Sequence, residues 1–191
     1  MLTVLVIDES RSRAGEICAG LALAGYQVAA ILAGSENLSA EVERLQPDVI
    51  LIDTDSPTRD TLENLAAMYK DMPRPVVIFT QEDGQSTIRD AVRAGVSAYV
   101  VDGLDPKRIK PIVEVARAQF DESQALRREH DDLSRKLSDR KQVDKAKGVL
   151  MKARGLDEDA AYHAMRKLAM ERGQTLAKVA RDVIDMARVL L

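Results

Sequence analysis

Three acidic residues in the first part of the chain stand where runs of apolar residues end. Asp8 and Glu9 close the first run, and Asp53 closes a later one. If these runs are neighbouring parallel strands, the three carboxylates meet at the carboxyl edge of one sheet. Carboxylate oxygens suit a hard cation such as Mg²⁺, which would also lower the cost of placing a phosphoryl group on one carboxylate. The sequence therefore predicts a magnesium site, with Asp55 as a fourth candidate ligand.

Two other interpretations of these acids are open. The acids could simply cap strand ends close to helix N-termini. Alternatively, residues 49–55, Val-Ile-Leu-Ile-Asp-Thr-Asp, look like the aspartate nucleophile motif of haloacid-dehalogenase-type phosphatases. That motif normally opens the fold, whereas here an acid-tipped strand precedes it, Pro57 follows it, and the chain has no room for a large cap insertion. We therefore expect a protein that is not an enzyme.

The elements that must position the acids are five short apolar runs that alternate with amphipathic helical patterns. Continuous Val and Ile runs are typical of strands covered on both faces. The pattern predicts an α/β fold of the flavodoxin-like type, a five-stranded parallel sheet with helices on either side. The predicted strands are residues 2–7, 28–32, 49–52, 76–79 and 98–101.

Strand signals stop near residue 105, and a long helical linker is expected over residues 106–137. Leu126, Leu133 and Leu137 recur at helical spacing, although Ser123 and His130 interrupt the stripe. This pattern predicts a coiled-coil seam and hence a homodimer. The alternative is a last helix of the first domain followed by a solvated, charged linker.

The last fifty residues predict a small all-helical bundle. Gly155 and Gly173 read as helix C-caps, which divides the segment into helices over residues 138–154, 157–172 and 175–190. Each helix has one apolar stripe, and the three stripes together predict one core. The residues expected in that core are Val143, Ala146, Leu150, Ala153, Ala161, Ala164, Met165, Leu168, Ala169, Leu176, Val179, Ala180, Val183 and Ala187.

Charge is distributed unevenly along the chain. The formal net charge is −3, but the residues before Ser134 hold 14 Lys and Arg against 23 Asp and Glu, and the rest hold 14 against 8. A basic segment fused to an acidic one suggests a polyanionic partner, although solvated lysines would give the same count. The single cysteine, Cys18, cannot form an intrachain disulfide, and no apolar run approaches the length of a membrane helix. We expect a cytoplasmic protein without a membrane role.

One face of the first bundle helix carries Lys141, Lys145, Gly148 and Lys152. This face lies opposite the apolar stripe, and a glycine inside a helix costs about 1 kcal/mol relative to alanine. We expect Gly148 to permit close approach of another backbone, from a packed helix or from a nucleic acid. The alternative is a solvated lysine face with a packing glycine.

Tyr162 lies one turn before Arg166 on the second bundle helix. Such a pair could stack on an unpaired base. It could equally be a half-buried tyrosine covered by an arginine stem.

Residues 1–120 resemble the response-regulator receiver family. The resemblance rests on the acidic pair after the first strand, the acceptor aspartate Asp53, a hydroxyl at Thr80 after the fourth strand, and an aromatic ring at Tyr99 in the fifth. It implies that the acids bind Mg²⁺, that Asp53 is the phosphoacceptor, and that Thr80 and Tyr99 form the switch. Receivers have a lysine just after the fifth strand, but this chain has Asp102 there. A carboxylate would repel the phosphoryl group, which favours a pseudo-receiver that works as a binding platform.

Residues 135–191 resemble the ANTAR domain, a three-helix RNA-binding module of transcription antiterminators. The motifs are Ala146-Lys147-Gly148, Leu150-Met151 and Ala169-Met170. The resemblance implies contact with RNA, for which the candidates are Lys141, Lys145, Lys147, Lys152, Tyr162 and Arg166. Lys147 lies at the margin of the packed face, so a structural role is also open.

A receiver followed by an ANTAR domain is the layout of antitermination regulators of nitrogen metabolism, and the acidic strings resemble the nitrate and nitrite assimilation members. The resemblance implies a dimer that binds two hairpins of a nascent leader RNA and prevents an overlapping terminator. It also implies an inhibitory, nitrate-sensing partner protein. The alternative is a DNA-binding response regulator activated by phosphorylation of Asp53, but residues 176–191 mix Asp182 and Asp185 with the basic residues that a recognition helix needs.

Overall fold

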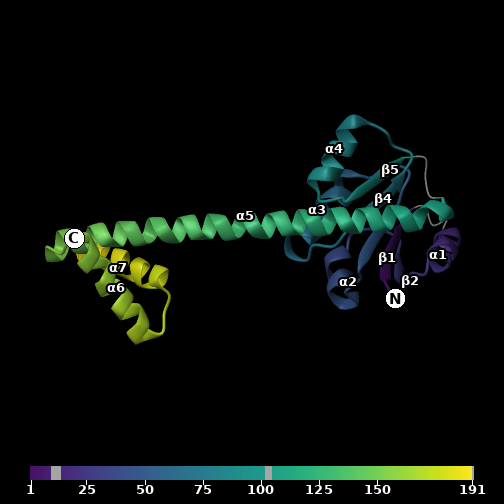
Figure 1. Ribbon diagram of the computed structural model, residues 1–191. Coiled ribbons are helices and arrows are strands. Elements are labelled where there is room, and N and C mark those ends of the chain that lie inside the picture. The colour runs from purple at the N-terminus through teal and green to yellow at the C-terminus, as the bar shows by residue number, and fades with distance from the viewer. Residues whose placement is uncertain (10–13, 102–104, 191) are drawn as a thin grey trace. The chain divides into compact units, whose positions relative to one another are not determined.

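The computed structural model describes residues 1–9, 14–101 and 105–190. The chain divides into an N-terminal unit, Met1–Gln124, and a C-terminal unit, Ala125–Leu191. Helix α5, Pro106–Arg154, contributes its first part to the N-terminal unit and its remainder to the C-terminal unit. The two units are described separately below, and most of their elements are labelled in Figure 1.

The N-terminal unit is built on a five-stranded parallel sheet (Figure 1). The strand order is β2-β1-β3-β4-β5, which is the flavodoxin-like order. The predicted fold class is therefore confirmed. The strands are β1 Thr3–Asp8, β2 Gln27–Leu32, β3 Val49–Asp53, β4 Val76–Thr80 and β5 Ala98–Val101.

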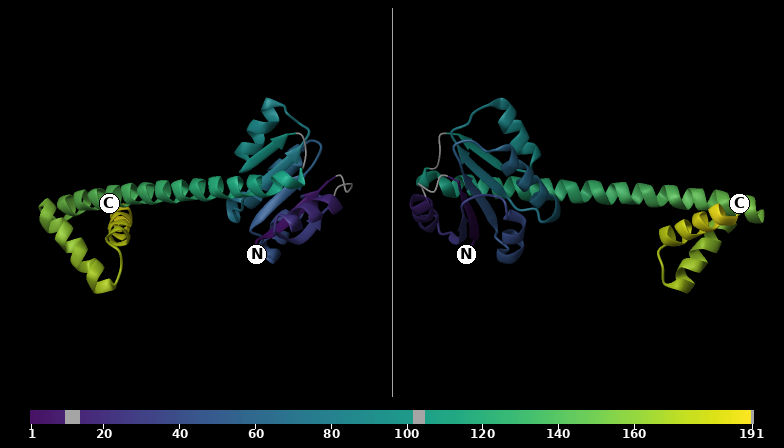
Figure 2. Two further views of the ribbon diagram at one scale, coloured as in Figure 1. Left: turned by 45° about the vertical axis from the view of Figure 1, so that its right-hand side comes forward. Right: turned by 180° about the vertical axis from the view of Figure 1, so that it is seen from behind.

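Helices cover both faces of this sheet, as Figure 2 shows. Alternate residues of each strand point to opposite faces, so every central strand supplies two cores. One core joins Val4 and Val6 to residues of α1 and α5, and the other joins Leu5 and Ile7 to residues of α2, α3 and α4. The bounds are α1 Ala14–Leu23, α2 Leu38–Leu45, α3 Arg59–Asp71 and α4 Gln85–Arg93.

The ring of Tyr69 on α3 fixes the part of α5 that belongs to the N-terminal unit. Tyr69 makes an edge-to-face contact with Phe120, with ring centroids 6.1 Å apart, and its hydroxyl accepts a hydrogen bond of 3.0 Å from the amide of Gln124. Gly95 lies against the same ring with φ +94°, and a Cβ there would fall 2.5 Å from the ring. Glycine is therefore required at this position, both for the backbone and for the space.

The C-terminal unit consists of the remainder of α5 with α6, Glu158–Arg172, and α7, Leu176–Leu190. Their shared core contains Ala146, Met165, Ala169, Val179, Ala180 and Ile184. Gly155 follows the end of α5 and Gly173 caps α6, both with positive φ, as predicted. None of the helices that the structure describes is both long and apolar enough to span a membrane.

Two details of the predicted bundle are wrong. The helix expected to begin at Ser138 does not begin there, because α5 runs without a break from Pro106 to Arg154. Ser138 has the residue type of an N-cap, but no glycine or proline lies between Pro111 and Ser138 to end the helix there. Ala153 and Ala164, expected in the core, are exposed, whereas Ile184 and Ala177 are buried.

Candidate functional sites

Asp8 and Asp53 lie side by side at the carboxyl ends of two central strands. They are register partners in the β1–β3 pair, and their exposed fractions are 1% and 0%. The backbone continues the pairing one residue further, because the Glu9 amide donates to the Asp53 carbonyl at 3.3 Å. Parallel strand pairing thus places the two predicted carboxylates next to each other in a buried position.

The carboxylate of Glu9 is bound to two threonine hydroxyls. Thr54 donates to Glu9 Oε2 and Thr61 donates to Glu9 Oε1, each at 2.8 Å. Thr61 lies in the first turn of α3, where the N-cap Thr58 accepts a hydrogen bond from its backbone N–H at 3.1 Å. Glu9 therefore connects the end of β1 to the start of α3. No sequence pattern marks these threonines, because their partner lies about 50 positions away in the chain.

The buried carboxylates of Asp8 and Asp53 have the chemistry that a divalent ion requires, since Mg²⁺ prefers oxygen ligands. The described residues contain no group of three or more His, Cys, Asp or Glu side chains placed to hold a metal ion. Glu9 is engaged with the threonines, and Asp55 is exposed. The structure thus brings two of the four predicted ligands together, and a magnesium site that uses all four remains a prediction.

Thr80 and Tyr99 meet at the loop after β4. The Thr80 hydroxyl donates to the Asp55 carbonyl at 2.8 Å and accepts from the Glu82 amide at 3.1 Å. The Tyr99 hydroxyl donates to the Glu82 carbonyl at 3.0 Å. Burial raises the pKa of Tyr99, while a hydrogen bond with Thr80 acts in the opposite direction. The two predicted switch residues are thus joined through Glu82, whereas Asp102 lies outside the described residues.

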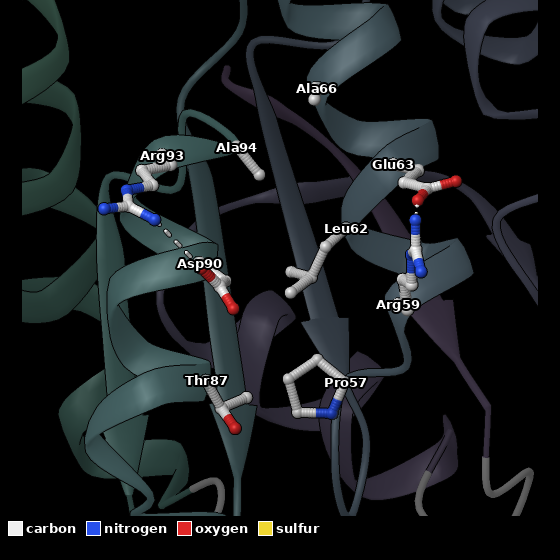
Figure 3. A pocket seen from close by; sticks show the side chains of 9 residues that line it. All are labelled: Pro57, Arg59, Leu62, Glu63, Ala66, Thr87, Asp90, Arg93 and Ala94. Atoms are coloured by element: carbon white, nitrogen blue, oxygen red, sulfur yellow. Dashed lines mark hydrogen bonds and ion pairs between the residues drawn. The ribbon is translucent and has the colours of Figure 1, made fainter.

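A groove of about 600 Å³ lies between α3 and α4 (Figure 3). Arg59 is ion-paired with Glu63 at 2.6 Å on one side, and Arg93 with Asp90 at 3.5 Å on the other. The groove could not be predicted from the sequence, because its residues carry no motif. All four charged side chains are more than half exposed, so none of them is held in a buried position from which it would orient a ligand. Its lining residues are Pro57, Arg59, Leu62, Glu63, Ala66, Thr87, Asp90, Arg93 and Ala94.

In the C-terminal unit, most of the predicted RNA contacts are exposed cations. Lys141, Lys145 and Lys152 on α5 and Arg166 on α6 are exposed, and none of them forms an ion pair with any described residue. Tyr162 is 37% exposed, and its ring makes an edge contact with His163 at a centroid distance of 6.0 Å. The surface thus has free positive charge and an accessible aromatic ring.

Lys147 differs from these cations. Its ammonium lies 2.8 Å from Asp144 Oδ1 and 2.7 Å from Glu158 Oε1, and its side chain is only 16% exposed. Hydrogen bonds to the two carboxylates raise the pKa of Lys147. Because Glu158 is in the first turn of α6, Lys147 links α5 to α6, which is the structural role left open by the sequence.

The basic residues of α7 are also bound within the chain. Lys178 pairs with Asp182 at 2.6 Å, Arg188 pairs with Asp185 at 3.7 Å, and Arg181 Nε donates to the Ala177 carbonyl at 3.3 Å. A recognition helix needs cations that are available to the groove of DNA. This helix therefore presents few of the groups that DNA reading requires.

Comparison with family models decides what the two units are. The model of the response regulator receiver domain matches residues 4–114, and the model of the ANTAR domain matches residues 131–184. The chain belongs to the response regulator receiver family and carries an ANTAR domain. Both predicted resemblances are thereby confirmed, and the acidic site lies in the receiver whereas the free lysines lie in the ANTAR domain.

Two curated proteins that this chain resembles have names of regulatory proteins. The transcriptional regulatory protein PdtaR of Mycobacterium tuberculosis is 29% identical over 161 residues, which cover 84% of this chain and 78% of PdtaR. The nitrate regulatory protein of Klebsiella oxytoca is 36% identical over 85 residues, which cover 44% of this chain and 22% of that protein. Among solved structures, the signal receiver domain of a modulated diguanylate cyclase from Desulfovibrio desulfuricans superposes with a TM-score of 0.57 at 20% identity. The match covers 64% of this chain and 98% of that one. This similarity supports the fold of the N-terminal unit.

Proposed function

We propose that the protein is a transcription antiterminator whose ANTAR domain, residues 135–191, binds two hairpins of a leader RNA and prevents formation of an overlapping terminator. The observation that carries the proposal is the set of exposed cations on α5 and α6 that form no ion pair with any described residue. Free cations in a domain that matches the ANTAR model are suited to a polyanion.

Recognition combines two kinds of contact. Lys141, Lys145 and Lys152 bind phosphates, while Tyr162 and Arg166 contact unpaired loop bases by stacking or along their edges. Side chains cannot read the deep groove of paired RNA, so sequence specificity has to come from the loops. Lys147 is assigned to the α5–α6 link, because two carboxylates already hold its ammonium.

The receiver, residues 1–120, serves as the regulatory platform. Mg²⁺ held by Asp8 and Asp53 would supply positive charge beside a phosphoryl group on Asp53. Asp102 stands in the sequence where receivers have a lysine, so a negative charge replaces the positive charge that would attract the phosphoryl group. This replacement favours control by a bound protein over control by phosphorylation. Within the receiver, Asp8 and Asp53 place two buried carboxyl groups side by side, Glu9 connects β1 to α3, and Thr80 and Tyr99 fix the loop after β4.

The active form is a homodimer joined through the linker, residues 106–137. Leu126, Leu133 and Leu137 are 61%, 59% and 56% exposed, although all three are large apolar side chains. Their spacing along α5 places them in a single stripe that a second copy can cover.

The genes controlled are those of nitrate and nitrite assimilation, and an inhibitory nitrate-sensing protein is the partner. Support comes from the 36% identity to the nitrate regulatory protein of Klebsiella oxytoca. The site of action is the cytoplasm, where nascent RNA is available.

A mobility-shift titration of the full-length protein tests the proposed function. The probes are a two-hairpin leader RNA, versions of it with altered loops, and duplex DNA of equal length. We expect binding that depends on the loops and that exceeds binding to the duplex. A preference for duplex DNA would instead support a DNA-binding response regulator, and absence of binding to any probe would leave a module that only associates with proteins.

A further inference from the structure

Gly148 lies inside α5 on the same stripe as three exposed lysines. Lys141, Lys145, Gly148 and Lys152 follow one another at spacings of four, three and four residues, which places them on one side of the helix. A Cβ placed on Gly148 would have no heavy atom within 4 Å. No contact within the part of the chain that the structure describes therefore requires glycine at this position.

Gly95 shows what a structurally required glycine looks like in this protein. There the backbone has φ +94° and a Cβ would collide with the ring of Tyr69. Gly148 has neither feature, because it has ordinary helical geometry and open space around it. A glycine in a helix interior also weakens the helix relative to alanine. Glycine at residue 148 thus does not stabilise the described part of the chain. It leaves the backbone of α5 uncovered by a side chain, so that a binding partner can approach the backbone closely on this side.

We propose that Gly148 is the point at which the RNA sugar-phosphate backbone lies directly against α5, with Lys145 and Lys152 binding phosphates on either side of it. The inference rests on the proposed RNA-binding function and assigns the position of the RNA on the domain. A side chain at residue 148 would hold the polyanion away from the helix. The flanking ammonium groups would then reach fewer phosphates.

The charges on this side of α5 favour a polyanion over a second copy of the chain. Lys141, Lys145 and Lys152 are exposed and form no ion pair with described residues, so two copies packed through this side would bring rows of like charges together. Like charges at short range oppose association. The proposed dimer uses the leucine stripe, which lies earlier along α5 than Lys141, Lys145 and Lys152.

The proposed RNA contact extends along α5 from Lys141 to Lys152 and is not limited to Gly148. Lys141 and Lys152 are eleven positions apart, which corresponds to about 16 Å along the helix axis. That length is sufficient to follow several successive phosphates of one RNA strand. We therefore expect the contact to contribute affinity without sequence preference, while the loops contribute specificity.

The test uses the full-length protein and RNA selected by the wild type from a pool of two-hairpin RNAs with randomised loops. Gly148→Ala and Gly148→Leu are compared with Ala164→Leu, which adds bulk at an exposed position of α6. Affinity is measured by fluorescence anisotropy at several salt concentrations, Tm by circular dichroism, and self-association by sedimentation. Lys145→Gln is measured alongside as a probe of the proposed function.

We expect Gly148→Ala to raise the Tm, because alanine is the better helix former, and yet to weaken RNA binding. Gly148→Leu should lower the affinity about tenfold and reduce the slope of log affinity against log salt concentration by about 1, while Ala164→Leu leaves both unchanged. Opposite effects on stability and binding would identify a contact position.

Three results would overturn the inference, and they separate it from the proposed function. If Gly148→Leu binds RNA like the wild type while Lys145→Gln binds more weakly, RNA binding stands and the role of Gly148 is wrong. If Gly148→Ala lowers the Tm or Gly148→Leu changes only self-association, the glycine serves the protein's own packing. If the wild type selects no RNA from the pool, the proposed function and the inference both fail.

Discussion

The ammonium of Lys147 lies 2.7 Å from the carboxylate of Glu158 and thereby joins α5 to the first turn of α6. Asp144, one turn before Lys147 on α5, lies 2.8 Å from the same ammonium. Two lysines only two positions apart in the sequence thus have different roles, because Lys145 is exposed and forms no ion pair with any described residue. The distinction decides which lysine stabilises the domain and which is available to RNA.

The pair Lys147→Gln and Lys145→Gln makes this distinction measurable. Lys147→Gln removes the charge that joins α5 to α6, so we expect the Tm of the protein to fall by a few degrees. Lys145→Gln should leave the Tm unchanged and weaken RNA binding. Circular dichroism melts and anisotropy titrations of the two variants check the prediction. Equal Tm values for both variants, with equal losses in affinity, would mean that Lys147 also contacts RNA.

The contact between Gly95 and Tyr69 predicts a large loss of stability in Gly95→Ala. The new methyl group would lie 2.5 Å from the ring of Tyr69, and the backbone would hold alanine at φ +94°. We expect the free energy of unfolding to fall by about 3 kcal/mol, measured by urea denaturation.

Gly25→Ala is the matched control for this substitution. Gly25 has φ +85°, but a Cβ there would have no neighbour within 4 Å. Its cost should therefore be backbone strain alone, about 1 kcal/mol. Similar losses in the two variants would show that the Tyr69 ring moves aside at little cost and does not fix α5.

The hydrogen bond of Tyr26 leads us to expect that the free energy of unfolding falls in alkaline solution. Its hydroxyl donates to Glu114 Oε1 on α5 at 3.0 Å, and burial, together with this carboxylate, raises the pKa of Tyr26 from 10.0 to about 12. A raised pKa favours the protonated form in the folded state, so the contribution is complete below pH 10 and is lost as the pH rises towards 12. Urea denaturation across this range should show a steeper decline for the wild type than for Tyr26→Phe. Parallel declines would show that this hydroxyl does not titrate as described.

The exposed leucines of α5 predict self-association. Leu133→Lys places a charge in the stripe that also contains Leu126 and Leu137, so we expect a shift from dimer to monomer in sedimentation velocity experiments. Met170→Lys on α6 is the control, because Met170 is 75% exposed and lies outside that stripe. A wild-type protein that is monomeric at high concentration, or an unchanged dimer in Leu133→Lys, would contradict the proposed seam.

The sequence predicts the parts of this fold that depend on local pattern. Runs such as residues 49–52 are recognisable because a strand covered on both faces needs continuous apolar residues, and the order of the runs places Asp8 beside Asp53. Gly155 and Gly173 end helices for reasons that are local to the backbone. These features need no knowledge of distant contacts.

Features that depend on tertiary contacts are less predictable. The bond from Thr61 to Glu9 joins residues 52 positions apart, and no pattern in the sequence announces it. Ser138 resembles a helix start, but α5 continues through it because nothing nearby breaks the helix. Ala164 matches the apolar period of α6 and is nevertheless exposed, since α5 and α7 cover only a narrow stripe of α6.

The most direct test of the central claim compares two lysine substitutions in the full-length protein. Lys145→Gln and Lys178→Gln make the same change of charge at exposed positions, but Lys178 already pairs with Asp182 whereas Lys145 has no such pair among the described residues. In anisotropy titrations against a two-hairpin leader RNA, we expect Lys145→Gln to weaken binding about three- to tenfold and to reduce the salt dependence, while Lys178→Gln binds like the wild type. Equal affinities for all three proteins, or tighter binding to duplex DNA than to the RNA, would contradict an antiterminator that binds RNA through α5.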